Sequence, residues 1–159
     1  RSNFNLTYIL LDNSIYGLTK GQISPTSPMG MKSGTSPYGN IARPLNPTTL
    51  ALAYGATFVA RTFSRERDMV SELITKAIQH KGFSFIHDLS PCVVFNKVVT
   101  YDSVNDASAM LPEGHDILDR SKAMTLAEST EPIYQGLFFR EEVPSFDDHA
   151  KQVRDGLKD

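Results

Sequence analysis

The sequence predicts an α/β fold with a mostly parallel sheet and helices on both of its faces. Short apolar segments rich in strand-forming residues alternate with segments whose apolar residues recur at helical spacing. The first predicted strand, residues 6–11, is apolar throughout, which is typical of a parallel strand buried on both faces. Because no Gly-x-Gly-x-x-Gly motif follows a predicted strand, a Rossmann-type nucleotide-binding fold is a weak alternative. By length, residues 1–159 correspond to a single domain.

Boundary residues mark the individual elements along the chain. Asn46 is a favourable N-cap and Pro47 a favourable first residue for a helix that Gly55 ends. An amphipathic helix is predicted from Glu66 to His80. The other predictions are strands at 57–62, 83–89 and 133–140, helices at 118–129 and after the cap Ser145, an irregular segment at 97–116 and a C-terminal helical tail at 141–159.

Composition limits the classes of partner. A net charge of -2 gives no electrostatic reason to expect binding to nucleic acid. No run approaches the ~18 apolar residues of a membrane helix, and no export leader is recognisable. One cysteine cannot form an internal disulfide. We therefore expect a cytoplasmic protein that binds neither membranes nor nucleic acid.

The start of the sequence is unusual for a parallel-sheet protein. The chain begins at Arg1 without a start Met and enters an apolar strand almost at once. A strand of a parallel sheet normally has neighbours on both sides. We expect this chain to be the C-terminal part of a longer domain whose N-terminal part is missing, because it is cleaved, disordered or carried on another chain.

Residues 13–46 form a long segment that is dense in Gly, Pro, Ser and Thr. Loops longer than ~12–15 residues are usually either functional or disordered. Apolar side chains such as Tyr16, Leu18 and Tyr38 recur within the segment, and a disordered linker seldom carries them. The segment is therefore interpreted as a cofactor and substrate loop ordered over a site, although residues 33–36 are also typical of a disordered linker.

The beginning of this loop carries groups suited to a phosphate ligand bridged by a metal ion. It follows the carboxyl end of the first strand, where open α/β sheets bind their ligands. Asn13 offers an amide oxygen, Gly17 and Gly21 allow close backbone approach, and Thr19 and Lys20 add a hydroxyl and a cation. The same residue types also occur in ordinary loops after strands, so this pattern by itself leaves both readings open.

A longer motif distinguishes the two readings. It reads Asn13-x-Ile15-Tyr16-Gly17-Leu18-Thr19-Lys20-Gly21-Gln22-x-Ser24-Pro25-Thr26 and is followed by Pro-containing segments at 36–40 and 43–47. From about residue 6 to about residue 147 the chain resembles the β subunit of 2-oxoacid:ferredoxin oxidoreductases, of the 2-oxoglutarate or broad 2-oxoacid type. The resemblance implies the C-terminal portion of a thiamin diphosphate-binding fold.

The resemblance also implies the roles of individual residues. The side-chain oxygen of Asn13 and the backbone carbonyl of Ile15 are expected to bind the Mg²⁺ ion that holds the cofactor's diphosphate. A further ligand, from a Gly-Asp-Gly motif of the family, is absent from this sequence. Asp12 stands where the family often has a second Asn, which leaves the ligating position intact. The residues expected to contact the diphosphate are Gly17, Leu18 and Thr19.

Two further residues acquire expected roles in the same way. Lys20 resembles the family residue that faces the carboxylate of the substrate, and a point charge suits that task. Cys92 lies in the segment Ser90-Pro91-Cys92-Val93-Val94-Phe95-Asn96, which looks like the position of the fourth thiolate of a [4Fe–4S] cluster. Without the resemblance, a lone cysteine would be interpreted as a small core residue. His87 is expected to be structural.

The implied reaction is the oxidative decarboxylation of a 2-oxo acid, with 2-oxoglutarate preferred, to its acyl-CoA. The implied cofactors are thiamin diphosphate, Mg²⁺ and a [4Fe–4S] cluster, with CoA as co-substrate, ferredoxin as electron acceptor and an α subunit as partner. Because half of the metal site and most cluster ligands are absent, we expect this chain alone to be inactive. Two alternatives remain, namely a cluster-free thiamin-dependent decarboxylase or synthase and a non-catalytic, degenerate thiamin-fold interaction domain.

Overall fold

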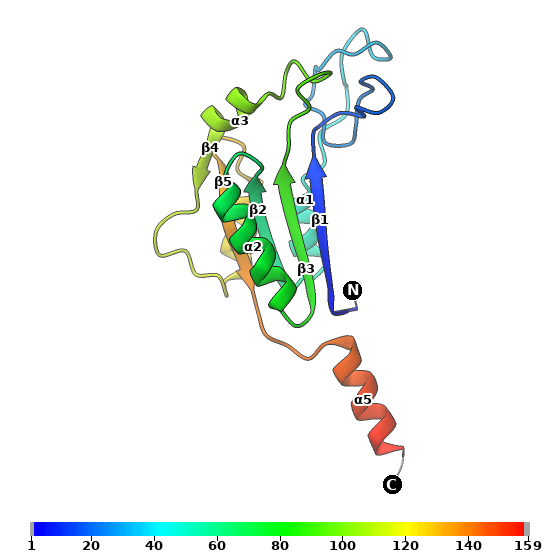
Figure 1. Cartoon of the computed structure of the whole chain (residues 1–159), viewed down its shortest axis with the longest axis vertical. Helices are drawn as coiled ribbons and strands as arrows, with labels where there is room; N and C mark the ends of the chain where they lie inside the picture. Colours follow the sequence, from blue (N-terminus) through cyan, green and yellow to red (C-terminus); the bar gives the residue numbers. More distant parts are fainter. Residues whose placement is uncertain (1, 158–159) are drawn as a thin grey trace.

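The computed structural model describes residues 2–157 and shows one five-stranded sheet with the strand order β1-β3-β2-β5-β4 (Figure 1). Arg1, Lys158 and Asp159, which belong to the predicted domain and its tail, lie outside the described residues. The strands are β1 (Leu6–Asp12), β2 (Phe58–Phe63), β3 (Phe83–Leu89), β4 (Ser108–Met110) and β5 (Ile133–Arg140). The helices are α1 (Pro47–Ala53), α2 (Arg67–Gln79), α3 (Tyr101–Ala107), α4 (Arg120–Glu128) and α5 (Phe146–Gly156).

Pairing in the sheet is mostly parallel. β3 lies between β1 and β2 and is parallel to both, and β4 is parallel to β5. β5 is antiparallel to β2, and a bulge between Val59 and Ala60 shifts their register. Asp12 and Phe63 both lie opposite Leu89, so the carboxyl ends of β1, β3 and β2 meet at one edge of the sheet. The long loop 13–46 and the segment after β3 both start from that edge (Figure 1).

Helices cover both faces of the sheet, as predicted. Helices α1 and α4 pack on one face, where Leu52 and Ala123 lie in the same cluster as Val59, Phe85 and Phe138. Helix α2 packs on the opposite face. There its buried residues Leu73 and Ala77 contact three residues of the sheet, which are Phe58, Ala60 and Ile86. The predicted α/β class, with a mostly parallel sheet between helices, is therefore confirmed.

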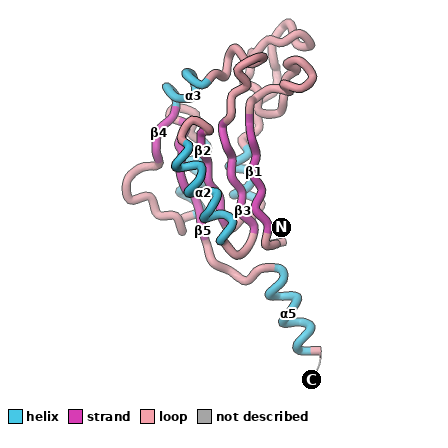
Figure 2. Tube along the Cα trace, in the orientation of Figure 1, coloured by secondary structure: helices cyan, strands magenta, loops and turns pink. Residues whose placement is uncertain are grey.

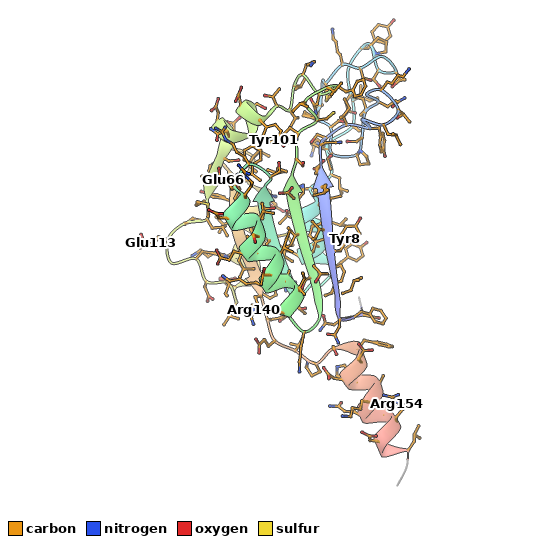
Figure 3. The ribbon with its side chains drawn as sticks, viewed as in Figure 1. Tyr8, Glu66, Tyr101, Glu113, Arg140 and Arg154 are labelled. Atoms are coloured by element: carbon orange, nitrogen blue, oxygen red, sulfur yellow. The ribbon has the colours of Figure 1, made fainter. Side chains whose placement is uncertain are left out.

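The expected burial of the first strand on both faces is wrong for this chain. β1 is an edge strand, and among residues 2–157 it pairs with β3 alone. Leu6, Tyr8 and Leu11 are 53%, 51% and 67% exposed. Tyr8 stacks at 5.9 Å on Phe85 and otherwise projects from the sheet (Figure 3). The apolar sequence of β1 predicted a neighbouring strand on each side, but among the described residues only β3 pairs with it.

The expectation that residues 97–116 are irregular is also wrong. The segment contains helix α3 and strand β4. A capping box starts α3, in which the hydroxyls of Thr100 and Ser103 satisfy each other's backbone N–H groups. The three residues of β4 are held by pairing with β5 from Ser108–Ile133 onward. That pairing joins distant parts of the chain, so local sequence patterns do not reveal it.

The C-terminal helix α5 extends away from the sheet (Figure 2). As predicted, Ser145 caps its start, and the Asp148 side chain completes a capping box. No residue of α5 is buried, and Arg154 points away from the rest of the molecule (Figure 3). Phe146 contacts Phe4 with ring centroids 4.6 Å apart. In the described part of the chain, no helix combines the length and the apolar character needed to cross a membrane.

Candidate functional site

The loop 13–46 is folded onto itself rather than extended. Met31 is 5% exposed, and backbone hydrogen bonds join Gly30 N to Asn40 O at 2.7 Å and Asn40 N to Met31 O at 2.9 Å. At Gly39 a side chain would be strained, since its Cβ would lie 2.8 Å from the carbonyl oxygen of Gly30 and the backbone φ is +100°. Residues 33–36 close a tight turn through reciprocal backbone hydrogen bonds. The loop therefore has the internal order expected of a functional segment.

A cavity of about 990 Å³ lies under this loop, between the loop, β1 and α1. Its size suits an organic cofactor. Its floor is apolar and includes Leu10, Phe85 and Ala51. Five residues predicted to bind the cofactor line its upper part, namely Asn13, Ile15, Gly17, Leu18 and Thr19. The fold thus brings all five to one cavity at the carboxyl edge of the sheet.

Asn13 and Ile15 are joined by a tight turn. The side-chain oxygen Oδ1 of Asn13 accepts a hydrogen bond of 3.1 Å from the backbone N–H of Ile15. Ser14 between them adopts a left-handed conformation with φ of +53°, which is uncommon for a residue other than glycine. The turn fixes the Asn13 side chain beside the Ile15 backbone. One lone pair of Oδ1 remains available for another ligand.

Backbone carbonyl groups around this turn differ in their partners. The carbonyls of residues 12, 13 and 14 each accept a hydrogen bond from the protein. Their donors are Ser90 N at 2.8 Å, Asn96 Nδ2 at 2.9 Å and Ser27 Oγ at 2.7 Å, respectively. The carbonyl of Ile15 accepts none from residues 2–157. An amide oxygen and an unpaired carbonyl two residues apart are hard ligands of the kind Mg²⁺ prefers, so these residues fit the predicted ion.

Asp12 is committed to other contacts. Its Oδ1 accepts hydrogen bonds from Ser14 N at 2.8 Å and from the Thr26 hydroxyl at 2.6 Å, and its Oδ2 lies 3.0 Å from His87 Nε2. Burial raises the pKa of Asp12, but the hydrogen bonds from His87 and Thr26 outweigh it and hold the pKa below the ordinary value. Asp12 therefore anchors the loop to the sheet, and Asn13 next to it faces the cavity.

A buried network continues from Asp12 into the protein. We define it as Asp12, His87, Thr48 and Arg61. His87 Nδ1 lies 3.1 Å from the Thr48 hydroxyl, which also accepts a 3.1 Å hydrogen bond from Arg61 Nε. Burial lowers the pKa of His87 and lowers that of Arg61 to about 10. Both ring nitrogens of His87 have partners, which is consistent with the structural role expected of it.

Arg61 has no carboxylate partner among the described residues, and it is only 3% exposed. Its guanidinium donates hydrogen bonds to the Asn46 side chain at 3.2 Å and to two backbone carbonyls. These belong to Ala127, at 3.1 Å, and Tyr134, at 3.3 Å. Arg61 thereby joins the cap of α1, the end of α4 and β5 beneath the site.

Cys92 lies against the loop 13–46. A Cβ atom added to Gly17 would be 3.5 Å from its Sγ atom, and the backbone N–H of Phe95 donates to Sγ at 3.5 Å. This N–H group and that of Val94 lower the pKa of the partly exposed thiol. The described residues contain no group of three or more His, Cys, Asp or Glu side chains that could hold a metal ion. Cys92 is thus a single, partly exposed thiol beside the loop, with a pKa below its ordinary value.

Lys20 lies at the exposed tip of the loop, outside the lining of the cavity. Its backbone is left-handed, with φ of +73°, and its N–H donates to the carbonyl of Gly17 at 3.1 Å. Pairing of Tyr16 with Gln22 closes the base of the tip. Leu18 is 99% exposed. The structure therefore places the predicted substrate lysine on the exposed tip, next to Thr19 of the cavity lining, rather than in the wall of the cavity.

Sequence reasoning assigned no role to Asn96, Thr48 or Arg61. Asn96 was visible only as the last residue of the cysteine motif, and its partner Asn13 is 83 residues distant. Arg61 offered one signal, because a charged residue within a strand of apolar neighbours must find partners in the interior.

Comparison with known proteins agrees with the resemblance. Residues 1–87 match the family model of the thiamine pyrophosphate enzyme C-terminal TPP binding domain, and residues 92–155 match that of the C-terminal part of the pyruvate ferredoxin oxidoreductase beta subunit. The 2-oxoglutarate synthase subunit KorB of Methanocaldococcus jannaschii is 36% identical over 99% of this chain and 59% of its own length. The corresponding protein of Archaeoglobus fulgidus is 33% identical over 97% of this chain and 55% of its own length.

A solved structure gives the same result. The 2-oxoglutarate:ferredoxin oxidoreductase from Magnetococcus marinus, with 2-oxoglutarate, coenzyme A and succinyl-CoA bound, matches with a TM-score of 0.95 and 41% identity. The match covers 98% of this chain and 54% of that chain. The chain thus spans little more than half the length of these relatives. It belongs to the family of thiamine pyrophosphate enzymes, as a C-terminal TPP binding domain of the kind found in 2-oxoacid:ferredoxin oxidoreductase β subunits.

Proposed function

We propose that this chain carries the cation and diphosphate site of a 2-oxoacid:ferredoxin oxidoreductase β subunit. The complete enzyme decarboxylates a 2-oxo acid oxidatively to its acyl-CoA and passes the electrons to ferredoxin. The observation that carries the proposal is the turn from Asn13 to Ile15. It offers an amide oxygen and an unpaired carbonyl beside a cavity of cofactor size, inside the family motif.

In this proposal Asn13 Oδ1 and the Ile15 carbonyl would hold Mg²⁺, which prefers oxygen ligands and would tether the diphosphate. Gly17, Leu18 and Thr19 follow directly and contact the diphosphate. Gly17 suits this role because the absence of a side chain lets the ligand approach its backbone. When bound, thiamin diphosphate supplies the nucleophilic carbon and the electron sink for decarboxylation. The contribution of the chain is to fix the diphosphate end and to exclude water with the apolar floor of the cavity.

Lys20 supplies the positive charge for the carboxylate of the 2-oxo acid. Its position at the mouth of the site suits a substrate that arrives after the cofactor and contacts the loop tip. We propose 2-oxoglutarate as the preferred substrate. Two relatives that match over nearly the whole chain are named 2-oxoglutarate synthase subunits, and the matching solved structure contains 2-oxoglutarate.

Cys92 is proposed as one thiolate ligand of a [4Fe–4S] cluster in the intact subunit, with the other ligands supplied from outside this chain. Backbone N–H groups that donate to sulfur favour the thiolate form that binds iron. A cluster-free thiamin enzyme would accommodate an inert, apolar cysteine, and Cys92 is partly exposed and hydrogen-bonded instead. Its position beside Gly17 suits electron transfer from the cofactor to the cluster.

The test is an assay of the intact β subunit assembled with its α subunit under anoxic conditions. We expect reduction of ferredoxin to require 2-oxoglutarate, CoA, thiamin diphosphate and Mg²⁺, and to be slower with pyruvate. Omission of each component in turn provides the controls. Failure of the assembled protein to bind thiamin diphosphate would contradict the proposal and support a degenerate interaction domain. Decarboxylation without ferredoxin reduction would support the cluster-free alternative.

A further inference from the structure

Asn96 is one of the few fully buried polar residues near the site, with 2% exposure. Both ends of its carboxamide are used. Oδ1 accepts the backbone N–H groups of Val98 at 3.1 Å and Val99 at 2.8 Å. Nδ2 donates at 2.9 Å to the backbone carbonyl of Asn13. The Asn96 side chain therefore stabilises the turn that follows it and also holds the backbone of Asn13, the proposed metal ligand, by a hydrogen bond.

Other contacts join the same two stretches, which we call the cysteine segment, residues 90–96, and the cation loop, residues 12–21. Ser90 N donates at 2.8 Å to the carbonyl of Asp12. At Gly21, an added Cβ would lie 3.5 Å from the side chains of both Phe95 and Ile15, so these three residues meet closely. The cysteine segment thus packs directly against the cation loop.

The hydrogen bond from Asn96 to Asn13 has a specific geometric consequence. A hydrogen bond to the Asn13 carbonyl fixes the peptide plane between Asn13 and Ser14. Ser14 needs such support, since its left-handed backbone is unfavourable for a residue other than glycine. If this peptide plane rotated, the Asn13 side chain and the Ile15 carbonyl would no longer be held in their present relation. Correct presentation of the two oxygens therefore depends on a residue that contacts neither the ion nor the cofactor.

We propose that Asn96 is a positioning residue that couples the cysteine segment to the cation site. The inference rests on the proposed function, namely that Asn13 and Ile15 bind the cation and that Cys92 binds a cluster. Ligation of Cys92 holds the segment in its turn and so favours the loop geometry that binds the cation. By linkage, loss of the cluster weakens cation binding, and loss of the cation weakens retention of the cluster.

The substitution Asn96→Asp removes the donor to Asn13 and places a carboxylate oxygen against the Asn13 carbonyl. An aspartate keeps the acceptor oxygen for the Val98 and Val99 amides but replaces the donor to Asn13 with a second oxygen. The matched control is Asn105→Asp, since Asn105 is exposed on α3 and its side chain accepts only a long bond from Arg65. Both variants are made in the intact β subunit, assembled with the α subunit. Thermal unfolding without cation and cofactor verifies that each variant is folded.

The measurement is Mn²⁺ affinity by electron paramagnetic resonance at saturating thiamin diphosphate, with Mn²⁺ replacing Mg²⁺. We expect Asn96→Asp to weaken Mn²⁺ binding at least about tenfold, as loss of a supporting partner of a metal ligand typically does. Asn105→Asp should bind as the wild type does. In the wild type, chemical removal of the cluster should also weaken Mn²⁺ binding, whereas in Asn96→Asp the affinity should be nearly independent of the cluster.

The outcomes separate the two proposals. If the wild-type complex binds no Mn²⁺ with thiamin diphosphate, the proposed function fails. If it binds, and Asn96→Asp binds within about twofold of it, the positioning role is overturned while the proposed function stands. The cluster experiment on the wild type needs no substitution. Equal Mn²⁺ affinity with and without the cluster would overturn the coupling even if the variant did not fold.

Discussion

The buried network beneath the loop 13–46 and the exposed tip of that loop are built in opposite ways. In the buried network, Thr48, Arg61 and His87 are 0%, 3% and 4% exposed, and each has hydrogen-bond partners on other elements. At the tip, Leu18 is 99% exposed, and in a later part of the same loop Tyr38 is 96% exposed. Through Asp12, this network fixes the start of the loop to the sheet. The tip has an ordered backbone but exposes apolar and charged side chains, as is typical of a surface that a ligand or another chain covers.

The largest expected effect is the loss of stability in Arg61→Leu. The substitution removes the donor to the Thr48 hydroxyl and to the Tyr134 carbonyl. It also removes one of the two donors to the Ala127 carbonyl, which keeps the hydrogen bond from Asn46 Nδ2. We expect the free energy of unfolding to fall by about 3–5 kcal/mol, measured by chemical denaturation. Arg65→Leu is the control, because Arg65 is exposed and should change stability by less than about 0.5 kcal/mol. Similar losses of unfolding free energy in both variants would mean that the buried network contributes no more to stability than an exposed site does.

The next effect concerns the proposed ligand itself. Asn13→Ala should weaken Mg²⁺-dependent thiamin diphosphate binding by roughly 100-fold in the intact β subunit, since a ligand to the ion is lost along with the turn to Ile15. Equilibrium titration with and without chelator measures the change. Asn105→Ala, on exposed α3, should leave the affinity unchanged. Wild-type affinity in Asn13→Ala would remove Asn13 from the cation site.

A smaller effect is expected at the tip. Lys20→Ala should raise the KM for the 2-oxo acid about tenfold and leave thiamin diphosphate binding intact, because a charged hydrogen bond to the substrate is lost at an exposed position. Lys32→Ala changes another exposed lysine of the same loop and is the matched control. Equal KM values for both variants would show that the tip lysine does not meet the substrate carboxylate.

The smallest effect is a pH dependence of the free energy of unfolding that arises from His87 in the buried network. Burial lowers the pKa of His87 below its ordinary value, so in mildly acidic solution the unfolded chain binds a proton that the folded chain does not. Stability is therefore complete above about pH 6.5 and declines as the pH falls below that value, by at most about 1.4 kcal/mol per pH unit for this group. Burial lowers the pKa of His80 as well and adds to the same trend.

His87→Gln tests the origin of this slope, since a glutamine can still donate to Asp12 but does not titrate. The decline in unfolding free energy between pH 7 and pH 5 should be shallower in this variant than in the wild type. His149→Gln, on the exposed face of α5, should leave the slope as it is. An unchanged slope in His87→Gln would assign the acid sensitivity to other groups.

Local patterns were sufficient for most of the fold. Asn46 and Pro47 stand as cap and first residue of α1, and the predicted strand 83–89 coincides with β3, because caps and periodicity act over a few residues. The motif singled out five residues that line the cavity in the folded chain. The contact from Asn96 to Asn13, the network below the loop and the exposure of β1 depend on pairing between distant segments. No local signal encodes such pairing, so only the folded chain reveals it.

The most direct test of the account is to locate the ion. A crystal structure of the intact enzyme with thiamin diphosphate and Mn²⁺ would identify the metal by its anomalous scattering. The account predicts an ion within about 2.0–2.3 Å of both Asn13 Oδ1 and the Ile15 carbonyl oxygen, in contact with the diphosphate. An ion held elsewhere, or a diphosphate bound without these two oxygens, would contradict it.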